Sequence, residues 1–184
     1  MLILLDQDGV LADFERGFHD GWNARGDVPC PALPLAARQS FYVRDDYPSE
    51  NRDVVEGIYT APGFFRDLPP MPGAIEAVAA LLAQGHDVRI CTSPLNQWRH
   101  CVTEKYEWVE RHLGTDFVHR MIVTKDKTVV YGDVLVDDKP AVTGTRQPVW
   151  QHVIFDQPYN RHVAGPRMTW ASWQAVLPQL ARRC

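Results

Sequence analysis

The sequence predicts an α/β fold: a Rossmann-like core on a parallel sheet, with a small helical cap inserted after the first strand. Short apolar runs alternate with helical patterns over most of the chain, which is the order of elements in a parallel α/β core. One stretch rich in proline and aromatic residues interrupts this alternation. With 184 residues, the chain can bury one main core and a small inserted unit.

Short, mostly apolar runs mark the expected strands. They lack the clean alternation of a strand that faces water on one side, as is typical of strands buried on both faces of a parallel sheet. In chain order the runs are 2–5, 88–91, 121–123, 134–136 and 153–155.

Helical patterns lie between and after these runs. Residues 74–82 are rich in alanine and leucine, and residues 97–113 carry apolar side chains at three- and four-residue spacings. Because Thr169 is a good N-cap residue, residues 170–182 are expected to form a closing helix that Pro178 kinks or splits. The tryptophans expected to pack helices on the sheet are Trp98, Trp108, Trp170 and Trp173.

The stretch 16–67 holds many of the prolines and aromatic residues of the chain. We interpret it as an inserted, mainly helical cap, so that residues 1–15 and 68–184 together form the core. Residues 69–73 (PPMPG) have the composition of a hinge that leads back into the core.

Bulk properties exclude several classes of protein. A hydrophobic content of 45% and a charged content of 23% are ordinary for a soluble domain, and no apolar run reaches the roughly 18 residues of a membrane span. The N-terminus has no basic region or cleavage site of a secretory signal, so we expect a cytoplasmic protein. A net charge of −4 without a basic run argues against nucleic-acid polymers as partners, but not against a single nucleotide. The cysteines, expected to be reduced and without a chemical role, are Cys30, Cys91, Cys101 and Cys184.

Polar residues follow four of the expected strands. Because the carboxyl ends of parallel strands meet at one edge of the sheet, where open α/β folds bind ligands, we expect these side chains to converge. They are Asp6 and Asp8, Thr92 and Ser93, Lys125 and Lys127, and Asp137 and Asp138. Each pair alone is typical of a turn, a helix cap or a solvated loop, but the four together indicate a phosphoryl-transfer site with a hard divalent cation.

The residue types predict their roles. A carboxylate such as Asp6 can attack phosphorus as a nucleophile, and Asp8 can protonate the leaving group and then deprotonate water. Asp137 and Asp138 offer the oxygen ligands that Mg²⁺ prefers. The residues expected to bind phosphate are Thr92, Ser93 and Lys127. For Lys105 the pattern leaves two alternatives, a side chain directed at the phosphate and a solvated helix lysine.

Residues 4–14 (LLDQDGVLADF) resemble the first motif of the haloacid dehalogenase superfamily, and in extended form that of the 5'(3')-deoxyribonucleotidase family. The resemblance continues over most of the core. The further matching segments are 72–74 (PGA), 91–94 (CTSP), 104–109 (EKYEWV), 125–128 (KDKT) and 136–140 (VDDKP).

The resemblance implies a Mg²⁺-dependent phosphatase that hydrolyses nucleoside monophosphates, with pyrimidine deoxynucleotides preferred. It implies metal ligation by Asp6, the backbone carbonyl of Asp8, Asp137 and Asp138, without deciding which of the last two binds directly. The residues that match the family's base-binding aromatic positions are Phe14, Phe41, Tyr42 and Tyr59, the two tyrosines standing in place of tryptophan. Gln7 and Lys139 also depart from the family's usual methionine and arginine.

Three other functions are weighed against this one. A phosphatase of another small phosphomonoester would need the same residues. A dehalogenase has no need of an acid two residues after its nucleophile, and a non-catalytic nucleotide-binding protein has no need of Asp6 and Asp8 together. The oligomeric state, a homodimer included, does not follow from the sequence.

Overall fold

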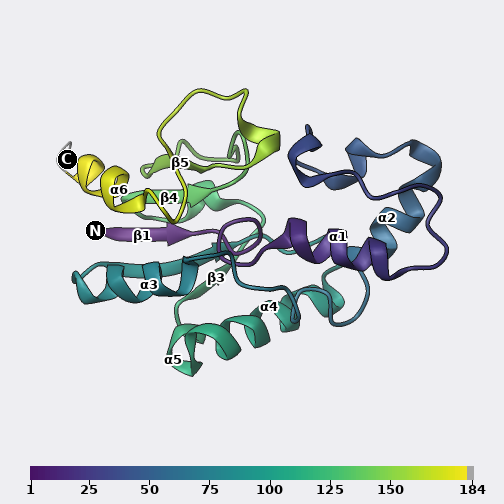
Figure 1. Ribbon diagram of the computed structural model, residues 1–184. Coiled ribbons are helices and arrows are strands. Elements are labelled where there is room, and N and C mark those ends of the chain that lie inside the picture. The colour runs from purple at the N-terminus through teal and green to yellow at the C-terminus, as the bar shows by residue number, and fades with distance from the viewer. Residues whose placement is uncertain (182–184) are drawn as a thin grey trace.

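The computed structural model describes residues 1–181 and is built on a six-stranded sheet of order β3-β2-β1-β4-β5-β6. Every neighbouring pair is parallel, as the α/β prediction requires. The strands are β1 (Leu2–Leu5), β2 (Asp87–Thr92), β3 (Met121–Val123), β4 (Val134–Asp137), β5 (Gln151–Phe155) and β6 (Arg167–Met168). In Figure 1 the strands point away from the N-terminal side of the molecule, so their carboxyl ends share one edge.

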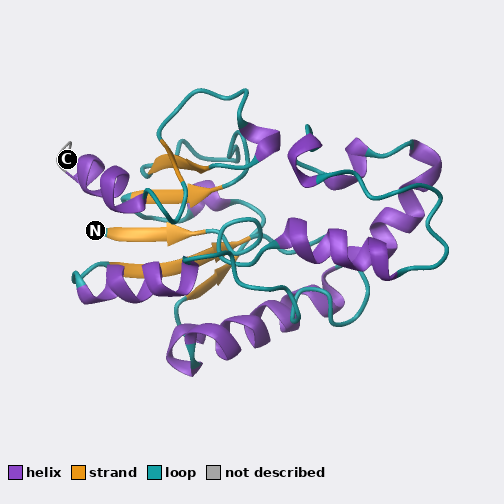
Figure 2. Cartoon of the chain, in the orientation of Figure 1, coloured by secondary structure: helices purple, strands orange, loops and turns teal. Residues whose placement is uncertain are grey.

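The sheet is buried on both faces, as the apolar runs predict. Alternate residues such as Ile3, Leu5 and Ile90 pack in one cluster with side chains of the helices. Leu4 and Leu135 point to the opposite face, where non-helical segments that include the buried Trp150 cover them. Helices therefore cover one face and connecting segments the other (Figure 2).

The core helices are α3 (Ala74–Ala83), α4 (Trp98–Leu113), α5 (Thr115–Val118) and α6 (Trp173–Ala181). The two expected between strands, α3 and α4, are confirmed to within one residue at each end. Neither β6 nor α5 was predicted, because two and four residues are too few for a recognisable hydrophobic period.

Two predictions for the tryptophans and the closing helix need correction. Trp98 is 58% exposed, because residues 96–100 at the start of α4 all lie outside the core. Thr169 does not cap the last helix: it forms a turn with Ser172, whose backbone N–H donates to the Thr169 carbonyl at 3.0 Å, and α6 begins only at Trp173. The helix runs through Pro178 without splitting, and Arg182 lies outside the described residues. The other tryptophans, Trp108, Trp170 and Trp173, are buried in the core as expected.

The stretch between β1 and α3 has helices and 3₁₀ turns as its regular elements. It contains α1 (Phe14–Ala24), α2 (Arg52–Tyr59) and the 3₁₀ turns η1 (Leu35–Ala37), η2 (Val43–Asp46) and η3 (Ser49–Asn51). It has its own apolar cluster, made of Phe18, Trp22, Val43, Tyr47, Val55 and Ile58. In Figure 1 α1 and α2 lie beyond the carboxyl ends of the strands, on the side toward which β1 points.

Across residues 1–181 no helix combines the length and the apolar character needed to cross a lipid bilayer. Cys30, Cys91 and Cys101 are free thiols, and Cys184 lies outside the described residues.

Candidate active site

The loop after β1 brings the first acidic pair to the sheet edge. It turns back on itself because the backbone N–H groups of Leu11 and Ala12 both donate to the Gln7 carbonyl at 2.8 Å. Gly9 has a φ of 73°, in the left-handed region that favours glycine. A Cβ atom on Gly9 would also collide with Asp138 Oδ2, so this position requires glycine for two reasons.

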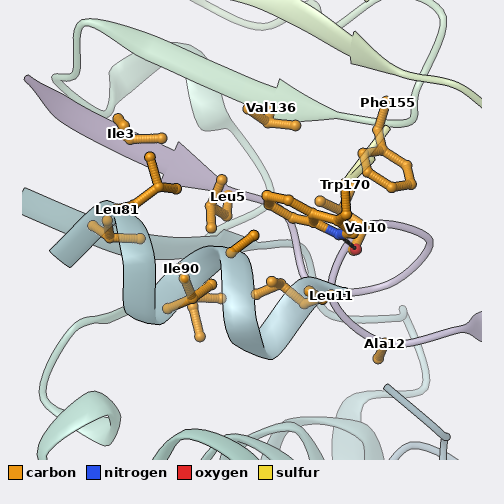
Figure 3. Close-up of a cluster of buried hydrophobic side chains, with 14 of the residues drawn as sticks. Ile3, Leu5, Val10, Leu11, Ala12, Leu81, Ile90, Val136, Phe155 and Trp170 are labelled. Atoms are coloured by element: carbon orange, nitrogen blue, oxygen red, sulfur yellow. Dashed lines mark hydrogen bonds between the residues drawn. The ribbon is translucent and has the colours of Figure 1, made fainter. Parts of the chain in front are cut away.

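The outer side of this loop is tied to the C-terminal part of the chain. The Trp170 indole N–H donates to the Val10 carbonyl at 2.7 Å, and Figure 3 shows the Trp170 ring beside Val10 within the core cluster. The Gln157 side-chain amide donates to the Gly9 carbonyl at 2.8 Å. These bonds fix the loop from a segment far away in the sequence.

Three buried carboxylates meet at the sheet edge. Asp6, Asp137 and Asp138 each offer one oxygen, and these oxygens lie within 4.8 Å of one another. Burial raises the pKa of Asp6 to about 6, although Lys127 opposes the shift. Burial and the nearby Asp137 carboxylate raise the pKa of Asp138 well above its ordinary value. Hard carboxylate oxygens with so little compensating charge fit a bound divalent cation such as Mg²⁺.

Lys127 is the cation of this group. Its ammonium nitrogen lies 2.7 Å from Asp6 Oδ2 and 2.6 Å from Asp137 Oδ2, and the side chain is buried. Burial lowers the pKa of Lys127, but the carboxylates of Asp137 and Asp6 more than offset this, so its pKa is raised and it stays charged. Lys125, the other lysine after β3, is exposed and donates to the Pro94 carbonyl.

Asp8 lies outside the carboxylate cluster and pairs with a second buried lysine. Lys105 Nζ lies 2.6 Å from Asp8 Oδ2 and 2.8 Å from Thr92 Oγ1, and the Lys105 side chain is fully buried. The solvated alternative for Lys105 is therefore wrong. Its spacing from Cys101 and Trp108 puts it on the buried stripe of α4, a signal that the sequence contains.

The second carboxylate oxygen of Asp8 has no hydrogen-bond partner within residues 1–181, although it is buried. Buried acceptors are rarely left unpaired in proteins, so this oxygen remains available to accept a hydrogen bond. Ser93 follows the buried Thr92 at the end of β2 and is half-buried.

The aromatic residues expected to bind a base fall into two groups. The Phe14 and Tyr59 ring centroids are 6.1 Å apart, where α1 begins and α2 ends. Phe41 and Tyr42 have centroids 5.0 Å apart, and Phe41 also lies 6.0 Å from the ring of Tyr159. Phe14, Phe41 and Tyr59 are half-buried, while Tyr42 is 50% exposed.

Two residues at the site were not predicted. The Tyr159 hydroxyl donates to Asp138 Oδ2, and the Asn160 side-chain amide donates to the Asp138 carbonyl at 2.7 Å. Both lie in η5 (Pro158–Asn160), just past the carboxyl end of β5. Polar residues that follow parallel strands lie at the ligand-binding edge of the sheet, and the same rule applied to β5 would have indicated this segment as well.

A parallel sheet whose first strand is followed by Asp6 and Asp8, with a lysine and an acidic pair at the same edge, defines the class of haloacid dehalogenase-like hydrolases. Solved structures of this class share the fold. The phosphate- and sodium-bound family hydrolase of Deinococcus radiodurans has a TM-score of 0.56 at 15% identity, with 98% of this chain and 96% of that chain covered.

Sequence comparisons narrow the class to one family. The family model described as 5' nucleotidase, deoxy (pyrimidine), cytosolic type C protein matches residues 1–183. The human cytosolic-type 5'(3')-deoxyribonucleotidase is 45% identical over 186 residues, covering 95% of this chain and 92% of that protein. A Bordetella pertussis protein, provisionally named a 5'(3')-deoxyribonucleotidase, is 57% identical over 178 residues, with 96% and 95% covered. The chain belongs to this family of phosphoric monoester hydrolases.

Proposed function

We propose that the protein hydrolyses nucleoside monophosphates, pyrimidine deoxynucleotides above all, in a Mg²⁺-dependent reaction with an aspartyl-phosphate intermediate. The observation that carries the proposal is the grouping of Asp6 with Asp137 and Asp138 at the sheet edge. Lys127 bonds both Asp6 and Asp137, and Asp8 follows two residues further along the chain. The names of the human and Bordetella relatives support the nucleotide as substrate.

In the first half of the reaction, a carboxylate oxygen of Asp6 attacks phosphorus and the bond from phosphorus to the sugar oxygen breaks. Asp8 gives its proton to the departing alkoxide. In the second half, Asp8 takes a proton from water, the water oxygen attacks phosphorus, and the acyl phosphate bond breaks to restore Asp6. The unpaired oxygen of Asp8 is free for both transfers.

The residues that would hold Mg²⁺ are Asp6, Asp137 and Asp138, with the backbone carbonyl of Asp8. When bound, the ion offsets the repulsion between an anionic nucleophile and an anionic phosphate. Lys127 supplies a fixed positive charge beside Asp6 for the oxygens of the transferring phosphoryl group. Thr92 and Ser93 can donate to the same oxygens from the end of β2.

Lys105 extends this set as a positioning residue. By donating to Asp8 and Thr92 together it holds the acid/base carboxyl and the phosphate-binding hydroxyl at a fixed separation.

We further propose that residues 16–67 work as a cap over the substrate, with residues 1–15 and 68–184 as the core. Two observations support this division: the stretch has an apolar cluster of its own, and α1 and α2 stand beyond the sheet edge that bears the carboxylates. Phe14 and Tyr59 at one side, and Phe41 and Tyr42 at the other, are aromatic faces on which a base can stack. The cytoplasmic location stays a prediction.

A panel of phosphomonoesters tests the proposal. We expect phosphate release in Mg²⁺ to be fastest with dUMP or dTMP, slower with ribonucleotides and sugar phosphates, and absent with chelator. Activity led by a sugar phosphate would keep the mechanism and discard the nucleotide. No metal-dependent release from any ester, an aryl phosphate included, would contradict the proposed reaction.

Substitution of Gly9 by Ala is expected to lower activity by about 10²-fold, the scale on which a misplaced catalytic group acts. The added methyl group collides with Asp138 and displaces the loop that carries Asp6 and Asp8. The matched control is Gly85→Ala, because Gly85 has a φ of 80° but no heavy atom within 4 Å of the added carbon. Both variants should lose about 1–2 kcal/mol of unfolding free energy from backbone strain. Equal activities in the two variants would show that the collision does not matter.

A further inference from the structure

Tyr159 connects the proposed metal site to the helical segment. Its hydroxyl donates to Asp138 Oδ2, and the side chain is only 2% exposed. A Cβ placed on Gly9 would lie 3.3 Å from the same hydroxyl, so the Tyr159 hydroxyl lies beside the loop that carries Asp6 and Asp8. A hydrogen bond from a buried hydroxyl restricts the rotation of a carboxylate and so orients it toward a cation.

The ring of Tyr159 is held by two side chains from the helical segment. The guanidinium carbon of Arg38 lies 5.3 Å from its centroid, and the Phe41 ring meets it edge-on at 6.0 Å and 76°. Tyr159 therefore has its hydroxyl on the core and its ring face on residues of the stretch 16–67.

Arg38 itself is fixed by a buried ionic network. It bonds Glu15, Asp46 Oδ2 at 2.5 Å and the Ser40 carbonyl at 2.8 Å, and its side chain is 2% exposed. Glu15 and Asp46 are almost as deeply buried, with side-chain exposures of 8% and 6%. Burying three charges gives little net stability, because desolvation offsets most of the attraction. The network instead fixes the guanidinium group of Arg38 in one position over the ring of Tyr159.

We infer that Tyr159 is a positioning residue for the carboxylate of Asp138, and that Arg38 holds Tyr159 in place, so that the helical segment and the metal site are energetically coupled. The inference rests on the proposed Mg²⁺ site. It has a direct consequence: a change in the helical segment at Arg38, which touches no metal-binding carboxylate, alters the affinity for Mg²⁺.

The test is the dissociation constant for Mg²⁺, measured by calorimetric titration of the metal-free protein. Tyr159→Phe is expected to raise it roughly tenfold or more, the usual scale for losing a partner that orients a metal ligand. Phosphatase activity on dUMP should need more Mg²⁺ in the same proportion. The control is Tyr47→Phe, which removes a hydroxyl that accepts from the Leu33 N–H at 3.0 Å and not one that donates to a candidate ligand, and it should leave the Mg²⁺ affinity unchanged.

Arg38→Lys tests the claim that Arg38 holds Tyr159 in place, and it does so without leaving Glu15 and Asp46 unpaired. Lysine keeps the charge but lacks the planar group that lies over the Tyr159 ring. It should weaken Mg²⁺ binding in the wild-type background and have little further effect in Tyr159→Phe, because Arg38 acts through the lost hydrogen bond.

The outcomes separate the two proposals. An unchanged Mg²⁺ affinity in a folded Tyr159→Phe variant overturns the positioning role, and additive effects of the two substitutions overturn the role of Arg38. Should Tyr159→Phe fail to fold, an unchanged affinity in Arg38→Lys overturns the coupling on its own. A wild-type protein that binds no Mg²⁺ contradicts the proposed function itself, and a wild type that binds it while these variants match it contradicts only the inference.

Discussion

Replacing Asp6 by Asn is expected to abolish turnover, with a loss on the order of 10⁶-fold, the scale for removing a covalent nucleophile. An amide cannot form the acyl phosphate, so the two-step route is closed. The fold should survive, because the amide oxygen can still accept from the Gln7 N–H, which lies 2.7 Å from Asp6 Oδ1. Lys127 also keeps its partner Asp137. Initial rates on dUMP with saturating Mg²⁺ measure the loss.

The same exchange at Asp13 is the matched control. Asp13 belongs to the same loop, but its carboxylate accepts from the Arg16 N–H at 3.0 Å as the N-cap of α1, a role that Asn performs equally well. Asp13→Asn should therefore keep near wild-type activity. Borohydride reduction of wild-type protein quenched during turnover should convert Asp6 to homoserine. Normal turnover by the Asn variant, or an unmodified Asp6 after quenching, would remove Asp6 from the nucleophile's role.

Much of the core could be predicted because its signals are local. Each apolar run is a strand, since a strand covered on both faces has to be apolar throughout, and the residue after it is at the ligand-binding edge by topology alone. The convergence of Asp6, Lys127, Asp137 and Asp138 follows from these two rules. The cluster spans separate strands, yet it needed no knowledge of long-range packing.

Other features depend on packing that a single sequence does not contain. The spacing along α4 indicates the burial of Lys105, but its contacts with Asp8 and Thr92 depend on how that helix lies against the β1 loop. Trp98 is a large apolar residue of the kind that usually packs in a core, but it lies at the start of the same helix, where the neighbouring residues are exposed as well. The contact of Arg38 with Tyr159 joins residues 121 positions apart (159 minus 38) and depends on where the helical segment lies. A hydrophobic period predicts which face of a helix is buried, but not how many turns of that helix are in contact with the rest of the protein.

Asp8→Asn is expected to lower kcat/KM on dUMP by roughly 10² to 10⁴-fold, the range for loss of general acid/base catalysis. The variant should fold, because the amide oxygen can still accept from Lys105, which lies 2.6 Å from the Asp8 carboxylate and also bonds Thr92. Mg²⁺ affinity should change little, because the Asp8 side chain lies outside the carboxylate cluster. A wild-type rate would remove the acid/base role, and a parallel loss of Mg²⁺ binding would assign Asp8 to the metal instead.

A comparison of two leaving groups tests whether Asp8 protonates the leaving group in the first half of the reaction. A sugar alkoxide is a poor leaving group that needs a proton as the ester bond breaks, whereas an aryl oxide with a low pKa departs without one. The ratio kcat/KM reports only on the steps up to and including the first irreversible step, which is the departure of the leaving group. It is therefore independent of the later attack of water on the acyl phosphate. Asp8→Asn should therefore lose much less kcat/KM on an aryl phosphate than on dUMP, while Asp6→Asn loses activity on both. Equal losses on the two esters would mean that Asp8 acts on the nucleophile or the phosphate, and not on the leaving group.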